Sequence, residues 1–181
     1  MVKIKVNKKK RSSKKKSNNE LLRRTNQDSS TIITVDDLPR PEIEPNALVS
    51  ELKQAQETLL EEGELGYPTI TGRKHDDESF LGVLCGPQIY QTGKAFAPDC
   101  KWICFTVESW ILTAPNAERM YEIYGSVENC PSEYRAEAIM ISFESPNESI
   151  DVIQLFTRDE EGKPVLGEIR VNSECNHRFY M

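Results

Sequence analysis

Residues 135–171 read RAEAIMISFESPNESIDVIQLFTRDEEGKPVLGEIRV, three short apolar runs separated by two clusters of turn-forming residues. In the first run, 136–144, bulky apolar residues alternate with small or polar ones, which is typical of a strand with one buried face. The second run, 150–157, is apolar on both sides and predicts a central strand. Because the connections at 145–149 and 158–164 are too short for a parallel return, the three runs predict an antiparallel meander.

Upstream of this stretch, residues 46–62 carry the clearest helical pattern of the chain. Apolar side chains recur at helical spacing on one face, at Leu48, Leu52, Ala55 and Leu59. Asn46 is suited to accept hydrogen bonds from the free amides of the first turn, and Gly63 is suited to end the helix. The pattern predicts a helix whose apolar face packs on the sheet.

The segments between this helix and the meander are shorter and less regular. They predict the start of a strand at 67–70, a hairpin or bent strand formed by 80–85 and 89–91, a connector at 93–99 and a strand at 101–113 that bends near Glu108. A short helix is expected over 117–124, with Met120, Ile123 and Tyr124 facing inward. The order of elements predicts an α+β fold, an antiparallel sheet with one or two helices packed on one face.

The charge of the chain divides it into two parts. Residues 1–24 hold eleven Lys/Arg and one Glu, a net charge of +10, whereas the remaining residues hold twelve Lys/Arg and 28 Asp/Glu, a net charge of −16. We predict a disordered basic tail at 1–30, a proline-containing linker at 31–45 and a single α+β domain at 46–181. An acidic domain repels phosphate backbones, so nucleic-acid binding by the domain itself is not expected.

The tail is the predicted polyanion-binding segment. Its basic residues are Lys8, Lys9, Lys10, Arg11, Lys14, Lys15 and Lys16. Such a run is typical of an arm that binds nucleic acid, of a nuclear localisation signal or of a solubilising tail.

The sequence shows neither a signal peptide nor an apolar run long enough to cross a membrane, so no membrane partner is expected. Five cysteines, an odd number without a regular spacing, favour free thiols in a reducing compartment. The expected location is the cytoplasm, or the nucleus if the source is eukaryotic.

No metal, cofactor or catalytic residue is assigned, although two glutamates are candidates for chemistry. Glu108 interrupts an apolar strand beside Trp110, a setting that suits acid/base catalysis. Glu137 on a neighbouring strand, with Glu144 and Asp151, could complete a Mg²⁺ site of the nuclease type. The competing interpretation is that acids are common at the edges of a sheet in an acidic protein.

Zinc binding by Cys100-x3-Cys104 is the other metal hypothesis, because this spacing suits one half of a structural zinc site. The second half is missing, since Cys130 stands alone and Cys175-x-His177 is a poor pair. Buried thiols are the favoured interpretation of Cys85 and Cys104.

One block of the sequence resembles small uncharacterised proteins of bacteria, plasmids and phages. It comprises Glu108-Ser109-Trp110, Pro131-Ser132-Glu133, Arg135, Glu137 and the run Ala138-Ile139-Met140-Ile141. The resemblance lies within residues 46–171 and implies no catalytic residue, because such proteins have no established activity.

Three functions remain open at this stage. The leading hypothesis is a non-enzymatic accessory or interaction protein whose basic arm tethers an acidic domain to nucleic acid or another polyanion. The alternatives are a carboxylate-based, Mg²⁺-dependent hydrolase or nuclease built on Glu108 and Glu137, and a viral or phage protein that binds a host protein.

Overall fold

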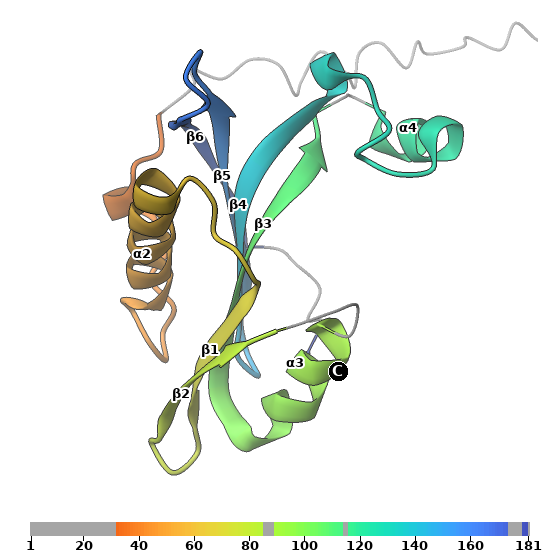
Figure 1. Cartoon of the computed structure of the whole chain (residues 1–181). Helices are drawn as coiled ribbons and strands as arrows, with labels where there is room; N and C mark the ends of the chain where they lie inside the picture. The colour runs from red at the N-terminus through yellow and green to blue at the C-terminus, as the bar shows by residue number, and fades with distance from the viewer. Residues whose placement is uncertain (1–31, 85–88, 114–115, 174–178, 181) are drawn as a thin grey trace, which may run out of the picture. The chain divides into compact units, whose positions relative to one another are not determined.

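The computed structural model describes residues 32–84, 89–113, 116–173 and 179–180, which belong to one compact unit. Six antiparallel strands form a single sheet in the order β2-β1-β3-β4-β5-β6 (Figure 1). The strands are β1 Thr69–Lys74, β2 Ser79–Val83, β3 Cys100–Leu112, β4 Arg135–Glu144, β5 Ser149–Arg158 and β6 Pro164–Asn172. The helices are α2 Ala47–Glu62, α3 Ile89–Phe96 and α4 Ala117–Tyr124, with short 3-10 turns at Val35–Asp37, Ala97–Asp99 and Ser132–Tyr134. The predicted α+β class is confirmed.

The meander of β4, β5 and β6 is present as predicted. Phe143 of β4 lies opposite Ile150 of β5, and Val152 lies opposite Val171 of β6, so the same face of all three strands is apolar. Gly162 takes a left-handed conformation (φ 80°) in the turn between β5 and β6, where other residues would be strained. β3 curves along β4 and pairs with it from Ile103 to Leu112 without a register shift, so the expected bend at Glu108 does not interrupt the pairing.

Helix α2 packs on the apolar face of the meander and of β3. Leu48, Leu52 and Leu59 have no exposed surface, and their neighbours in the core include Ile139, Ile141 and Phe143 of β4. Asn46 precedes the helix, but its side chain does not cap the first turn as predicted. Its Oδ1 instead accepts a hydrogen bond from Arg40 at 3.2 Å. Residues 32–45, predicted as a linker, contribute Leu38 to this core.

Gly63 ends α2 as predicted, with φ 84° and its N–H donating to the Leu59 carbonyl at 2.9 Å. No atom lies within 4 Å of the position that a Cβ would occupy, so a substitution meets conformational strain and no steric clash. Gly63→Ala is expected to lower the free energy of unfolding by about 1 kcal/mol. Urea denaturation checks this, with Glu62→Ala as the control; equal stability of Gly63→Ala and the parent would contradict it.

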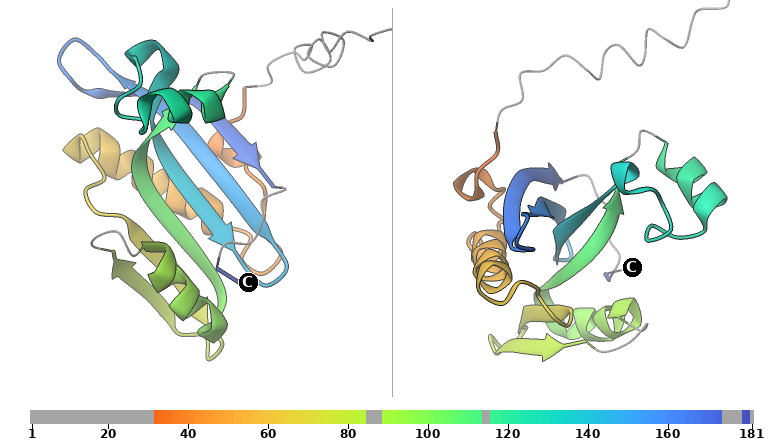
Figure 2. Two further views of the ribbon diagram at one scale, coloured as in Figure 1. Left: turned by 90° about the vertical axis from the view of Figure 1, so that its right-hand side faces the viewer. Right: turned by 45° about the horizontal axis from the view of Figure 1, so that its top comes forward.

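A second apolar cluster lies on the opposite face of the sheet, under α3 (Figure 2). The expectation of a strand at 89–91 and a connector at 93–99 was wrong, because α3 and a 3-10 turn occupy this segment. Gly93 and Ala97, four residues apart, are both buried there. A Cβ at Gly93 would meet the ring of Phe179, so the glycine permits a close contact within a helix and does not break it.

Helix α4 follows the end of β3 and projects beyond the sheet (Figure 1). The helix was predicted, but the inward orientation of Ile123 was wrong, since this side chain is 58% exposed. Met120 and Tyr124 of the same helix are half-buried.

Candidate functional site

Glu108 of β3 and Glu137 of β4 are brought together on the α2 face, as the sequence suggested. Arg158 of β5 lies between them, with its Nη2 3.3 Å from a Glu108 oxygen and its Nε 3.1 Å from a Glu137 oxygen. The register explains this meeting, because Trp110 pairs with Glu137 and Glu137 pairs with Phe156 across adjacent strands. The two carboxylates therefore share one guanidinium.

The cluster of Glu108, Glu137 and Arg158 also forms hydrogen bonds with the loop that follows α2. Arg158 donates from Nη1 to the Gly63 carbonyl at 2.9 Å, and the Leu65 N–H donates to Glu108 Oε2 at 2.9 Å. The exposed carbonyl at the end of a helix is thus satisfied by a cation, which is favourable at this end of the helix dipole. We assign the cluster to the attachment of the α2 C-terminus to the sheet.

Arg135, the first residue of β4, contacts the loop after α4 and the end of β3. Its guanidinium lies 4.6 Å from the centre of the Trp110 ring, and its Nη1 donates to the Glu128 carbonyl. A cation over the face of tryptophan is an attractive arrangement. Arg135 therefore connects the loop after α4 to the end of β3.

The Mg²⁺ hypothesis that joined Glu137 to Glu144 and Asp151 was wrong. Glu137 and Glu144 are seven positions apart on one strand, so their side chains point to opposite faces of the sheet. Glu144 is 1% exposed and accepts the Phe179 N–H at 2.9 Å, while Asp151 accepts from Ser142 at 2.6 Å. Among the described residues, no group of three or more metal-ligating side chains could hold an ion.

Cys100 and Cys104 also lie on different faces of the sheet. A register shift between Arg73 and Lys74 of the partner strand puts Cys100 in the cluster under α3 and Cys104 in the cluster under α2. They cannot form one half of a zinc site together. Cys104 is fully buried as predicted, whereas Cys85 and Cys175 lie outside the described residues.

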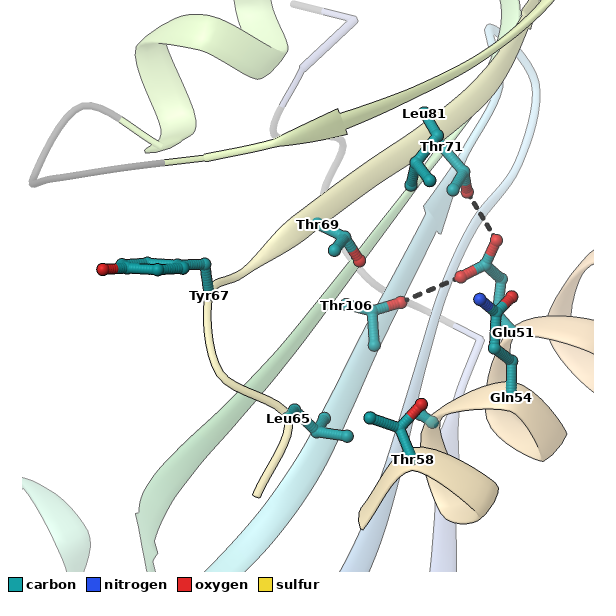
Figure 3. A pocket seen from close by; sticks show the side chains of 10 residues that line it. Glu51, Gln54, Thr58, Leu65, Tyr67, Thr69, Thr71, Leu81 and Thr106 are labelled. Carbon is teal, nitrogen blue, oxygen red and sulfur yellow. Dashed lines mark hydrogen bonds between the residues drawn. The ribbon is translucent and has the colours of Figure 1, made fainter. Parts of the chain in front are cut away.

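A pocket that sequence reasoning missed lies between α2 and strands β1 and β3 (Figure 3). Its cavity is about 160 Å³, and Glu51 of α2 is one of the residues that line it. Two hydroxyls donate to the Glu51 carboxylate: Thr71 Oγ1 at 2.6 Å and Thr106 Oγ1 at 3.2 Å. Burial raises the pKa of the Glu51 carboxyl above its usual value, while the two hydrogen bonds act in the opposite direction.

The register of the sheet explains why threonines gather there. Thr69 lies directly opposite Thr106 on β1 and β3, and Thr71 is two positions further on the same face of β1. Glu51 reaches this face because it borders the apolar stripe of α2, three residues after Leu48 and four before Ala55. The alternation of threonines at 69 and 71 was the available signal, but it does not show which helix residue lies above it.

The chain was compared with protein families, curated proteins and solved structures. No match was found in any of the three comparisons. The resemblance of the block between Glu108 and Ile141 to small uncharacterised proteins therefore stays a prediction.

The basic residues predicted to bind a polyanion, Lys8 to Lys16, lie outside the described residues. No helix in the described part of the chain is both long and apolar enough to cross a membrane.

Proposed function

We propose that the protein is a non-enzymatic accessory protein whose basic arm tethers an acidic α+β domain to nucleic acid or to another polyanion. The observation that carries the proposal is the separation of charge, +10 within residues 1–24 and −16 in the remainder. Lysines and arginines that contact phosphates release condensed counterions, which favours binding without reading the base sequence. The proposal includes a cytoplasmic location, or a nuclear one if the source is eukaryotic.

The ion pairs on the folded unit support the assignment of polyanion binding to the arm and not to the domain. Seven of its lysines and arginines lie in ion pairs with acids: Lys53, Arg73, Lys74, Lys101, Arg158, Lys163 and Arg170. A cation already paired with a carboxylate has less to gain from a phosphate, and the surrounding acids repel it. The domain is thus poorly suited to bind a polyanion, and the arm is the segment with unbalanced positive charge.

The position of Arg158 argues against the hydrolase alternative. A metal-dependent hydrolase needs carboxylates whose oxygens are free to bind an ion. One oxygen of Glu108 and both oxygens of Glu137 instead lie within 3.3 Å of the Arg158 guanidinium. The second oxygen of Glu108 accepts the Leu65 N–H. This arrangement supports a structural role for both acids.

Deletion of residues 2–24 is expected to abolish binding to duplex DNA and to RNA. For the full chain, log affinity should fall linearly with log salt concentration, by about 0.9 for each phosphate contacted in B-form DNA. Replacing Lys14, Lys15 and Lys16 with glutamine should therefore reduce the slope by about 3 and weaken binding to different sequences equally. Fluorescence anisotropy with labelled oligonucleotides over a range of salt concentrations measures both quantities.

The matched control replaces Lys94 of α3, Arg119 of α4 and Lys163 of the β5–β6 turn with glutamine. This variant loses the same charge from the folded unit and should keep the salt slope of the parent. Binding that survives deletion of the arm, or an equal change of slope in the control, would overturn the tether.

A further inference from the structure

We propose that the pocket between α2 and strands β1 and β3 binds an alkylammonium group, with Glu51 as the counterion and the strand threonines as its frame. The proposal concerns the folded unit and does not rest on the proposed tether. The ligand class follows from the arrangement of acceptors, charge and apolar walls in the pocket.

The carboxylate of Glu51 is held in place and retains acceptor capacity. Each of its oxygens receives one hydroxyl hydrogen bond, from Thr71 and from Thr106, on different strands (Figure 3). A carboxylate has about four acceptor positions, so about two are left for a ligand. Because α2 and two strands fix its direction, the group loses little conformational freedom when it binds.

The charge of the pocket selects a cation. Glu51 is the one charged residue among the ten that line it, and none of the ion pairs of the described residues includes it. A carboxylate that has lost part of its hydration, with no ion-pair partner among the described residues, attracts a positive ligand more strongly than an exposed acid does. The raised pKa of Glu51 has the same cause, the burial of the carboxyl group.

The remaining walls suit a short aliphatic stem. Leu65, Leu81 and Tyr67 supply apolar surface to the pocket wall. Leu81 and Tyr67 are 65% and 68% exposed, so a ligand could cover apolar surface that now faces water. Thr58 and Thr69 also line the pocket and add hydroxyl groups to its wall (Figure 3). An ammonium group presents three donors around a compact charge, which fits one carboxylate surrounded by hydroxyls.

Size further restricts the ligand. A cavity of about 160 Å³ is smaller than the roughly 300–1,000 Å³ typical of pockets for drug-sized molecules. It suits one side-chain-sized group, which could come from a lysine of a protein segment or from a free alkylamine. Both sources share the chemistry that Glu51 recognises, and the experiment separates them.

The test is an NMR titration of the full chain with two probes, n-butylamine and N-acetyl-lysine-methylamide, each at constant ionic strength. Saturable shifts are expected at the amides of Thr71 and Thr106 with at least one probe. The neutral analogues n-butanol and N-acetyl-norleucine-methylamide should bind more weakly by about tenfold or more, since they lack the charge-assisted hydrogen bonds. Saturation with the lysine probe alone would identify a protein segment, and saturation with both would identify the ammonium group itself.

Glu51→Gln should weaken binding of the charged probes by about tenfold or more, because it removes the counterion and keeps the shape of the side chain. Glu57→Gln, an equal charge change on an exposed part of α2, should leave affinity unchanged. The variant lacking residues 2–24 is titrated in parallel, because lysines of the arm would compete for the pocket. Absence of saturation in both forms, or equal weakening by Glu51→Gln and Glu57→Gln in folded proteins, would overturn the proposal.

Discussion

Phe143→Ala is expected to lower the free energy of unfolding by about 3–5 kcal/mol, the usual cost of removing a fully buried aromatic side chain. Phe143 has no exposed surface, and its ring stacks on Trp102 with centroids 5.7 Å apart. It lies on β4, between Cys104 of β3 and Ile150 of β5, under the apolar stripe of α2. The substitution therefore opens a cavity where helix and sheet meet, and neighbouring strands leave little room for collapse. Urea denaturation followed by circular dichroism measures the change.

Phe96→Ala is the matched control for this prediction. Phe96 also stacks on an aromatic ring, that of Phe80 at 5.6 Å, but it is 42% exposed at the end of α3. Its removal exposes less apolar surface and leaves a site that water can fill, so a smaller loss is expected. Equal losses for the two variants would contradict the assignment of the main core to the α2 face.

The core on the α2 face was largely predictable from the sequence. The alternation through Ile139, Ile141 and Phe143, together with the leucine stripe of α2, specifies two apolar surfaces that can only be buried against each other. Helix α3 was not predictable in the same way. Its short apolar pattern includes Gly93, a residue that usually interrupts a helix. The structure explains this glycine by its close contact with the ring of Phe179, far along the chain. Local propensity does not report such distant contacts.

Some of the site residues were likewise predictable from the sequence, and others were not. The sequence placed Glu108 and Glu137 on adjacent strands, and they meet as expected, but residue type alone does not identify Arg158 as their shared partner. Its role depends on strand register and on where α2 ends, neither of which is specified by residue type. Glu51 could not be singled out either, because a charged residue beside the apolar stripe of a helix usually faces solvent. Only the position of α2 above β1 and β3 shows that its carboxylate reaches Thr71 and Thr106.

Arg158→Met is the second substitution with a large expected effect, a loss of about 2 kcal/mol of unfolding free energy. It leaves two carboxylates, 20% and 17% exposed, side by side without a cation, and it leaves the Gly63 carbonyl without its donor. The substitution also removes the guanidinium from above the Phe156 ring, whose centre lies 5.4 Å away. Partial exposure makes the expected loss smaller than the roughly 3–5 kcal/mol seen when a fully buried pair is broken. Chemical denaturation at neutral pH measures it.

Arg170→Met tests whether the loss reflects the shared position of Arg158 or any lost ion pair. Arg170 pairs with Glu168 on the surface, with side chains 49% and 59% exposed, and such pairs contribute at most about 1 kcal/mol. In a Glu108→Gln/Glu137→Gln background, Arg158→Met should cost less, because no unpaired charge is left behind. A double-mutant cycle isolates this coupling. Full cost in that background would show that Arg158 acts through the Gly63 carbonyl and the Phe156 ring, and that the two acids are free for another role.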